Sequence, residues 1–224
     1  MQNQQGIVRF GNSELSFLAG RSIKHQNFDY KLASKLTEIL VESRKSSREG
    51  NYILCLPLEL TLKYSDINFE DWQDKPSEIK KIWRGIPRVI LPLFLNKNKT
   101  YGSPFLFRIK DTRNDQENFL LIEKTHELFS THDVIYVGPE DDKNKKYEDF
   151  LEPKKFIKIP SKNAFSNYDK ILRDVKIFEK KFNNPLIVIV AGITGTVLSA
   201  ELNNLGIFSI DFGQGFRHFR TTLD

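Results

Sequence analysis

The sequence predicts an α/β fold: a mostly parallel, doubly wound sheet, flanked by helices, in a single domain. The main observation is that the second half of the chain alternates strand-like apolar runs with helical segments, the pattern of right-handed β-helix-β units. The chain of 224 residues also shows no internal repeat and no long low-complexity linker. A division into two domains near residue 115 is the weaker alternative.

Two strands and several helices are expected in the first half of the chain. Apolar runs at 6–10 and 52–58 predict strands, and the second run is apolar throughout, as in a strand buried on both faces. Helical spacing of apolar residues is found at 28–43, in two or three stretches between 66 and 98, and at 119–129. Asn12 and Ser13 are good N-cap types, so a further helix should begin there.

The second half carries the clearest pattern. Strands are expected at 133–138, 156–160, 184–192 and 207–213, and helices at 161–182 and 195–206. Gly206 has the position of a C′ residue that closes the last helix. The charged segment at 140–150 is expected to be a solvated loop or a short helix.

Composition excludes several classes of protein. The lone cysteine, Cys55, lies in an apolar run and is expected to be an inert core residue. The four histidines lack the spacing of a zinc site. No apolar run approaches the ~18–20 residues of a membrane span, and the polar start MQNQQ does not resemble a signal peptide. A soluble, cytoplasmic protein is therefore expected.

The formal net charge of +5 is mildly basic. The positive charges are spread and interleaved with acids, which argues against a nucleic-acid-binding protein. The excess is expected to serve anionic ligands or a weak, peripheral attraction to an anionic membrane surface.

Three segments follow predicted strands, where open parallel sheets bind ligands. The turn at 191–196, AGITGT, combines two glycines with Thr194 and Thr196 and could face a phosphate. The alternative is a tight turn with a threonine cap. The segment at 191–196 is neither a P-loop nor a dinucleotide-binding glycine motif.

The other two segments are RFGNSE at 9–14 and PSKNAFSNYD at 160–169. In the first, Asn12 and Glu14 could face a hard cation or a ribose, or serve as a helix cap and a first-turn acid. In the second, Ser161, Lys162 and Asn163 offer a cation and amide donors, or a plain capping segment.

Five segments in order resemble the GT-D-type glycosyltransferase family. RFGNSE is similar to its Arg-Phe-Gly-Asp-Gly-Glu signature, TYGSPFLFR to its segment with a tyrosine and a downstream arginine, and VIYVGP to its central strand. IPSKNAFSNYDKIL resembles its Pro-Ser-x-Asn-Ala-Phe stretch, and the segment from AGITGT to IDFG resembles its closing unit. Together these segments cover about residues 6 to 214.

The resemblance implies a Rossmann-like single domain over residues 1–224 that moves a sugar from a nucleoside-diphosphate sugar, such as a UDP-sugar, to a glycan or glycoprotein acceptor. Such enzymes act in bacterial cell-surface polysaccharide and glycoprotein assembly. The family's Asp-x-Glu motif serves the donor diphosphate and a divalent metal, usually Mn²⁺.

Asn12 stands where the family has the aspartate, and Glu14 matches the glutamate. A neutral amide oxygen should weaken metal binding. Three outcomes stay open: weaker metal binding through Glu14, metal-independent transfer using cations such as Arg9 and Arg108, or lost activity.

Roles follow from the resemblance and from the chemistry of transfer, which needs a stabilised diphosphate and an activated acceptor hydroxyl. The catalytic candidates are Glu14, Asp211 and His218. For Asp211 a strand-end cap is the alternative, and for His218 a role in the tail. The donor-binding candidates are Arg9, Gly11, Asn12, Tyr101, Arg108, Ser161, Lys162, Asn163, Thr194, Gly195 and Thr196. The competing function is a non-catalytic module that binds a glycan or a partner.

Overall fold

The structure is a computed structural model that describes residues 4–45, 50–57, 95–96, 99–104, 106–107, 115–139 and 150–213. The helical stretches expected between 66 and 98 and most of the segment at 140–150 lie outside these ranges. In the described part of the chain no helix is long and apolar enough to span a bilayer.

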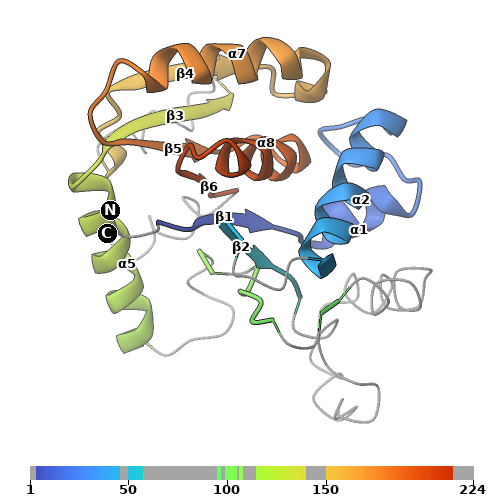
Figure 1. Ribbon diagram of the computed structural model, residues 1–224, viewed down its shortest axis with the longest axis horizontal. Helices are drawn as coiled ribbons and strands as arrows, with labels where there is room; N and C mark the ends of the chain where they lie inside the picture. The colour runs from blue at the N-terminus through green and yellow to red at the C-terminus, as the bar shows by residue number, and fades with distance from the viewer. Residues whose placement is uncertain are drawn as a thin grey trace.

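Six strands form one sheet in the order β2-β1-β6-β5-β3-β4, and every pairing between neighbours is parallel. The strands are β1 (Gly6–Arg9), β2 (Tyr52–Cys55), β3 (Asp133–Pro139), β4 (Lys155–Ile159), β5 (Pro185–Ile189) and β6 (Ser209–Asp211). The predicted parallel α/β sheet is therefore confirmed. Figure 1 shows the arrowheads of β1 and β3 pointing to the same side of the molecule.

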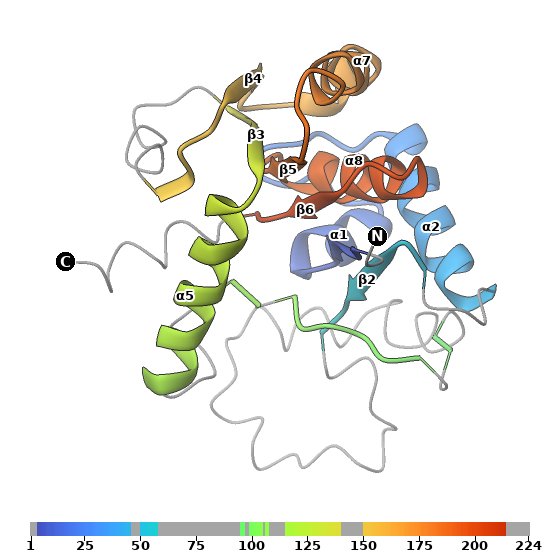
Figure 2. The same ribbon diagram turned by 60° about the vertical axis from the view of Figure 1, so that its left-hand side comes forward.

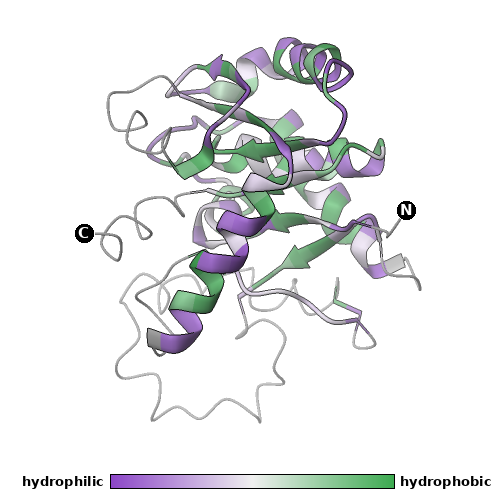
Figure 3. Cartoon of the chain, turned by 90° about the vertical axis from the view of Figure 1, so that its left-hand side faces the viewer, coloured by the Kyte–Doolittle hydropathy of each residue, from purple (hydrophilic) through white to green (hydrophobic). Residues whose placement is uncertain are grey.

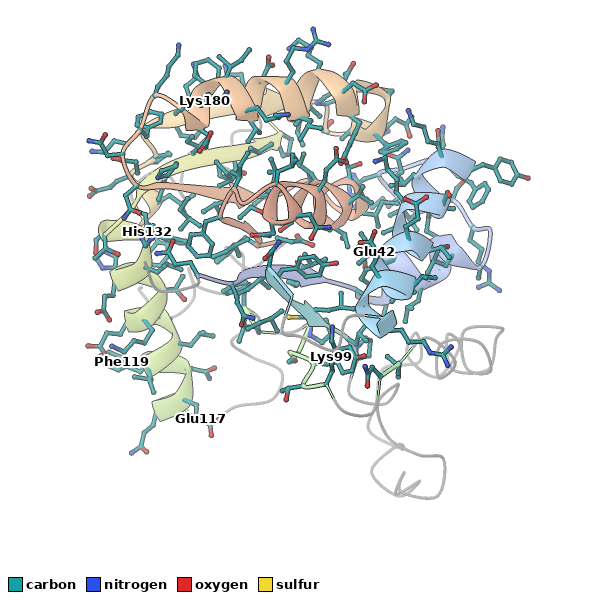
Figure 4. The ribbon with its side chains drawn as sticks, in the orientation of Figure 1. Glu42, Lys99, Glu117, Phe119, His132 and Lys180 are labelled. Carbon is teal, nitrogen blue, oxygen red and sulfur yellow. The ribbon has the colours of Figure 1, made fainter. Side chains whose placement is uncertain are left out.

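The helices lie on both faces of this sheet (Figure 2). They are α1 (Asn12–Leu18), α2 (Tyr30–Lys45), α5 (Asp115–Ser130), α7 (Tyr168–Glu179) and α8 (Ile193–Asn204), and a short 3₁₀ turn, η4 (Ala164–Asn167), precedes α7. Figure 4 labels Glu117 and Phe119 at one end of α5 and His132 just beyond the other end.

Alternate residues of the strands feed two apolar cores. Ile135, Ile187 and Ile189 pack with α1, α2, α7 and α8 on one face, and Val134 and Val188 pack with α5 on the other. The buried strands are hydrophobic over most of their length, as Figure 3 shows, which is expected of parallel strands covered on both sides. Cys55 is buried beside this core, and burial raises the pKa of its thiol to about 12, as expected of an unreactive position.

Several boundaries differ from the sequence-based expectation. The last strand is confined to Ser209–Asp211, and α8 begins at Ile193, so Thr194–Thr196 form its first turn instead of a turn before it. The N-cap of α1 is Gly11, so the expectation of a cap at Asn12 or Ser13 is wrong. Gly206 has φ of +79° after the C-cap of α8, which confirms its C′ position.

Candidate functional site

Four of the predicted site residues meet where the central strands end. Arg9 is the last residue of β1 and Asp211 the last of β6, and these two strands are neighbours in the sheet. Glu14 comes from the first turn of α1, and Thr196 from the first turn of α8. The crossover topology thus brings residues from both ends of the sequence to one edge of the sheet.

The hydroxyl of Thr196 is the centre of this group. Its Oγ1 lies 3.1 Å from the backbone oxygen of Arg9, 3.2 Å from Oδ2 of Asp211 and 3.4 Å from Oε1 of Glu14. A hydroxyl has one proton to donate, so it satisfies only one of these three oxygens. A protonated carboxyl could in turn donate to Oγ1, and the arrangement therefore favours a proton on one of the two acids.

Burial of the two carboxyl groups also favours a proton on one of them. Glu14 is 8% exposed and Asp211 is 4% exposed. Burial raises the pKa of Glu14, against backbone hydrogen bonds and the charge of Arg9 that lower it. Burial also raises the pKa of Asp211 to about 7, with Arg9 and Thr196 opposing the rise and Glu14 adding to it. Asp211 therefore changes its charge near neutral pH, as a general base should.

Arg9 is held in place by two backbone carbonyls. Its Nε donates to the oxygen of Pro104 at 2.9 Å, and its Nη1 donates to the oxygen of Phe212 at 2.7 Å. Gly213 has φ of +56°, and a Cβ there would lie 2.5 Å from Nη1, so glycine is needed for this close approach. The guanidinium is therefore a fixed positive charge that joins β1 to the chain after β6.

Glu14 also completes the start of α1. Its Oε2 accepts a hydrogen bond from the backbone N–H of Gly11 at 2.7 Å, the reach-back half of a capping box. Glu14 is therefore both a first-turn acid of α1, which was one interpretation of the sequence, and a member of the site. Asn12 is the first residue of the helix and is half-buried.

The turn that leads into α8 is tightly packed. Gly192 is the N-cap with φ of +56°, and Thr194 is 1% exposed. A Cβ on Gly195 would lie 3.1 Å from the Ile189 side chain and 3.6 Å from Oδ1 of Asp211. Gly195 therefore lets the first turn of α8 approach the end of β5 and the acid of β6.

The third predicted segment lies apart from this group. Ser161, Lys162 and Asn163 follow β4, which β5 and β3 separate from β6. Asn163 has φ of +52°, its N–H donates to the oxygen of His25, and its Oδ1 accepts from the N–H of Asn27, both at 2.8 Å. Asn163 thus fastens the connection between α1 and α2 to the end of β4.

Tyr101 lies beside β2. Its hydroxyl accepts a hydrogen bond from the N–H of Asn96 at 2.9 Å, and the next residue, Gly102, forms a parallel bridge with Cys55. This segment reaches the site through the carbonyl of Pro104. Arg108 and His218 lie outside the described residues, and their roles stay predictions.

The site predicted from the sequence did not include any backbone groups. The carbonyls of Pro104 and Phe212 hold Arg9, but a carbonyl leaves no signal in residue type. Gly213, directly after Asp-Phe, was the one local sign that another group approaches the backbone there.

The donor set fits a hard divalent cation in part. Among the residues that the structure describes, no group of three or more His, Cys, Asp or Glu side chains could hold a metal ion. Glu14 and Asp211 nevertheless place two buried carboxyls at one hydroxyl, and oxygen donors of this kind suit Mg²⁺ or Mn²⁺. A cation would also offset the negative charge that burial disfavours.

The fold and the site together define a class: a Rossmann-like α/β domain with an acidic and cationic cluster at the carboxyl edge of its sheet. A family model described as the glycosyltransferase GT-D fold matches residues 7–220. The chain belongs to this family.

Two curated relatives are bacterial proteins. The chain is 26% identical over 219 residues to glycosyltransferase GlyD of Streptococcus pneumoniae serotype 4 and 25% identical over 219 residues to probable glycosyl transferase Gly of Streptococcus gordonii. Each match covers 95% of this chain but 25% and 30% of the relative. The chain thus spans less than a third of the length of these relatives.

Solved structures share the fold. One, described as a highly conserved domain of unknown function with a distinct glycosyltransferase fold, has a TM-score of 0.73 at 28% identity, covering 98% of this chain and 77% of that one. A second, described as a new glycosyltransferase from Streptococcus sanguinis, has a TM-score of 0.70 at 23% identity, covering 99% and 80%. The expected Rossmann-like fold, a parallel sheet flanked by helices, agrees with the fold that the chain shares with these structures.

Proposed function

We propose that this chain transfers a sugar from a nucleoside-diphosphate sugar to the hydroxyl of a glycan or glycoprotein acceptor in bacterial surface glycan assembly. The observation that carries the proposal is the meeting of Arg9, Glu14, Thr196 and Asp211 at the carboxyl edge of the sheet. Membership of the glycosyltransferase family supports the reaction class.

In the proposed reaction, the acceptor oxygen forms a bond to the anomeric carbon while the bond from that carbon to the diphosphate breaks. Asp211 takes the proton of the acceptor hydroxyl, since its pKa near 7 allows both protonation states. Arg9 supplies fixed positive charge for the leaving diphosphate, and the first turn of α8, with Thr194, Gly195 and Thr196, lines the same place.

Asn12 and Glu14, which match the metal-binding motif of the family, are the residues that would hold a divalent cation such as Mn²⁺. When bound, the cation would neutralise charge on the diphosphate. Because Asn12 is neutral, we expect the affinity for the cation to be low in the absence of the donor. His218, Arg108, Lys162 and Tyr101 stay candidates for donor or acceptor contacts.

The test is a thermal-shift screen of nucleoside diphosphates and their sugars, with and without Mn²⁺, followed by transfer of a labelled sugar. A ligand that binds the folded state raises its apparent melting temperature, so a positive result identifies the donor base. If no nucleoside diphosphate binds under either condition, the proposal is wrong.

The second candidate function is a non-catalytic module that keeps the fold and binds a glycan or partner. The neutral Asn12 in the motif favours it. In that case Asn12→Asp should create metal-dependent donor hydrolysis that the unaltered chain lacks.

Peripheral association with the inner face of the membrane is part of the proposed function, because acceptors of surface glycan assembly are commonly held there. Such an association would use the surface of the domain.

A further inference from the structure

The net charge of the chain comes from one part of the fold. Residues 150–182, which contain β4 and α7, carry nine Lys or Arg and four Asp or Glu, and the remaining residues carry equal numbers of both. The entire formal charge of +5 therefore belongs to this segment. The positive residues themselves are spread along the chain, as expected, since 25 of the 34 (34 − 9) lie outside this segment, and only the excess over acids is concentrated here.

The fold exposes part of this charge on one helix. Tyr168, Ile171 and Val175 bury the inner face of α7 against the sheet. The side chains of the opposite side are exposed and spaced three or four residues apart, so they share one face. We call this the α7 basic face; its members are Lys170, Arg173, Lys176, Ile177 and Lys180, and the exposed acid Asp169 lies on the same side. Figure 1 places α7 at the outer rim of the molecule, and Figure 4 labels Lys180 on it.

Acids offset part of this charge, because α7 itself holds three basic and three acidic residues, and Lys180 adds a cation at its C-cap. Asp174 pairs with Lys170 at 3.1 Å, and Asp169 and Glu179 are the other acids of the helix. Arg173, Lys176 and Lys180 make no ion pair of their own among the described residues. Lys155 and Lys181 lie 4.2 and 4.8 Å from the ring centroid of Phe178, which packs against the core on the inner side of the helix, so these two cations are not counted in this face.

An apolar side chain lies within the basic face. Ile177 is 49% exposed between Arg173, Lys176 and Lys180. A helix that presents lysines and arginines around an exposed aliphatic side chain is suited to the boundary between lipid headgroups and acyl chains. A surface for single-stranded nucleic acid would instead be expected to stack aromatic side chains beside the cations, and the members of the α7 basic face include no aromatic residue.

We infer that the α7 basic face docks the domain on an anionic phospholipid surface. This rests on the peripheral association in the proposed function, but not on the transfer reaction. Attraction of about 1 kcal/mol per basic residue near an anionic membrane corresponds to roughly fivefold in affinity for each. Loss of Arg173, Lys176 and Lys180 together should thus weaken binding about a hundredfold.

The test is sedimentation with vesicles that contain phosphatidylglycerol, against vesicles of phosphatidylcholine alone. The unaltered chain should bind only the anionic vesicles, and less as salt rises. The variant Arg173→Gln/Lys176→Gln/Lys180→Gln should lose this binding, and Ile177→Ser should weaken it. The control Lys31→Gln/Arg44→Gln/Lys124→Gln removes the same charge from exposed positions on α2 and α5 and should bind like the unaltered chain.

Three results would overturn the inference. One is equal loss of binding in the two triple variants, which indicates an effect of total charge alone. Another is anionic-vesicle binding by the α7 variant at the level of the unaltered chain. The third is nucleic-acid binding through the α7 basic face with none to vesicles. Donor binding measured by thermal shift should be unchanged in the α7 variant, so failure of this inference and failure of the proposed transfer reaction are distinguishable.

Discussion

Helix α8 and strand β6 share two buried polar clusters, one near each edge of the sheet. Toward the amino edge, Asn203 donates to the backbone oxygens of Ser199 and Ser209 at 2.8 and 3.0 Å and accepts from the N–H of Ser209 at 3.1 Å. Ser199 in addition donates to the backbone oxygen of Ile7 at 2.9 Å. Toward the carboxyl edge, Thr196 meets the acids Asp211 and Glu14.

The two clusters differ in their charge and in how fully their hydrogen-bond donors and acceptors are paired. Every group in the amino-edge cluster is neutral, and both the donor and the acceptor of the Asn203 amide are paired, so burial costs little. In the carboxyl-edge cluster two acids compete for one hydroxyl, and burial raises the pKa of both. A fold can bury the first kind of cluster for stability alone. The second kind opposes stability and is the mark of a functional site.

Replacing the acid of the carboxyl edge should have the largest effect. Asp211→Asn removes the proposed base but keeps the shape, so we expect labelled-sugar transfer to fall by about 10²–10⁴. The free energy of unfolding should stay equal or rise, because the variant no longer buries an ionisable group. Asp133→Asn, at the start of β3 on the opposite edge, is the control and should retain activity. Full transfer by Asp211→Asn would exclude Asp211 as the base.

Breaking the amino-edge cluster should lower the stability of the fold and leave donor binding unchanged. Asn203→Leu leaves the buried N–H of Ser209 without its partner, and we expect a loss of about 3 kcal/mol in the free energy of unfolding. Urea unfolding measures this loss, while thermal shifts by the donor should stay as in the unaltered chain. Asn204→Leu makes the same substitution at the next, exposed position and should be nearly neutral. Similar losses in both variants would contradict a specific role for Asn203.

The clusters should also differ in their response to pH. The pKa of Asp211 is raised in the folded state from 3.8 to about 7, so the folded state holds a proton that the unfolded state releases between these values. The stabilising contribution of protonated Asp211 is therefore complete below its unfolded pKa and is lost as pH rises through about 7. The stability gained by Asp211→Asn should thus grow by about 2–3 kcal/mol from about pH 5 to about pH 8.

Urea unfolding of both chains, without metal, at these two pH values checks the expectation. The stability difference between Asn203→Leu and the unaltered chain should not change with pH, because no group in that cluster titrates in this range. A constant difference for Asp211→Asn would show that the acid is ionised throughout.

The sequence predicts the strands better than it predicts either cluster. Apolar runs such as 185–190 identify buried parallel strands, because burial on both faces requires continuous apolar character. The meeting of Arg9 and Asp211 follows from strand order, and a sequence of alternating elements does not specify which strand lies beside β1. The end of a predicted strand pointed to Arg9, whereas Asp211 was supplied by the family resemblance.

Contacts that depend on side-chain reach could not be predicted. Asn203 falls within a helical pattern as an ordinary polar residue, and only the fold places Ser209 against its amide. Asn163 was predicted to contact the donor, yet its side chain binds the connection after α1. The sequence predicts that α8 starts at Gly195, whereas the helix starts at Ile193 and Gly195 permits close packing inside its first turn.

The smallest expected effect is a difference between the hydroxyls of Thr196 and Ser199, which both belong to α8. The hydrogen bond from Thr196 lowers the pKa of Asp211, so it stabilises the ionised acid more than the protonated one. Thr196→Val should therefore cost more stability above pH 7 than at about pH 5, by about 1 kcal/mol. Thr196→Ser keeps the hydroxyl and should behave like the unaltered chain. Ser199→Ala removes a hydroxyl whose partners are neutral, and its cost in urea unfolding should be independent of pH. If Thr196→Val and Ser199→Ala respond alike to pH, the hydroxyl of Thr196 does not contact an ionised carboxylate, and the proposed difference between the two edges is wrong.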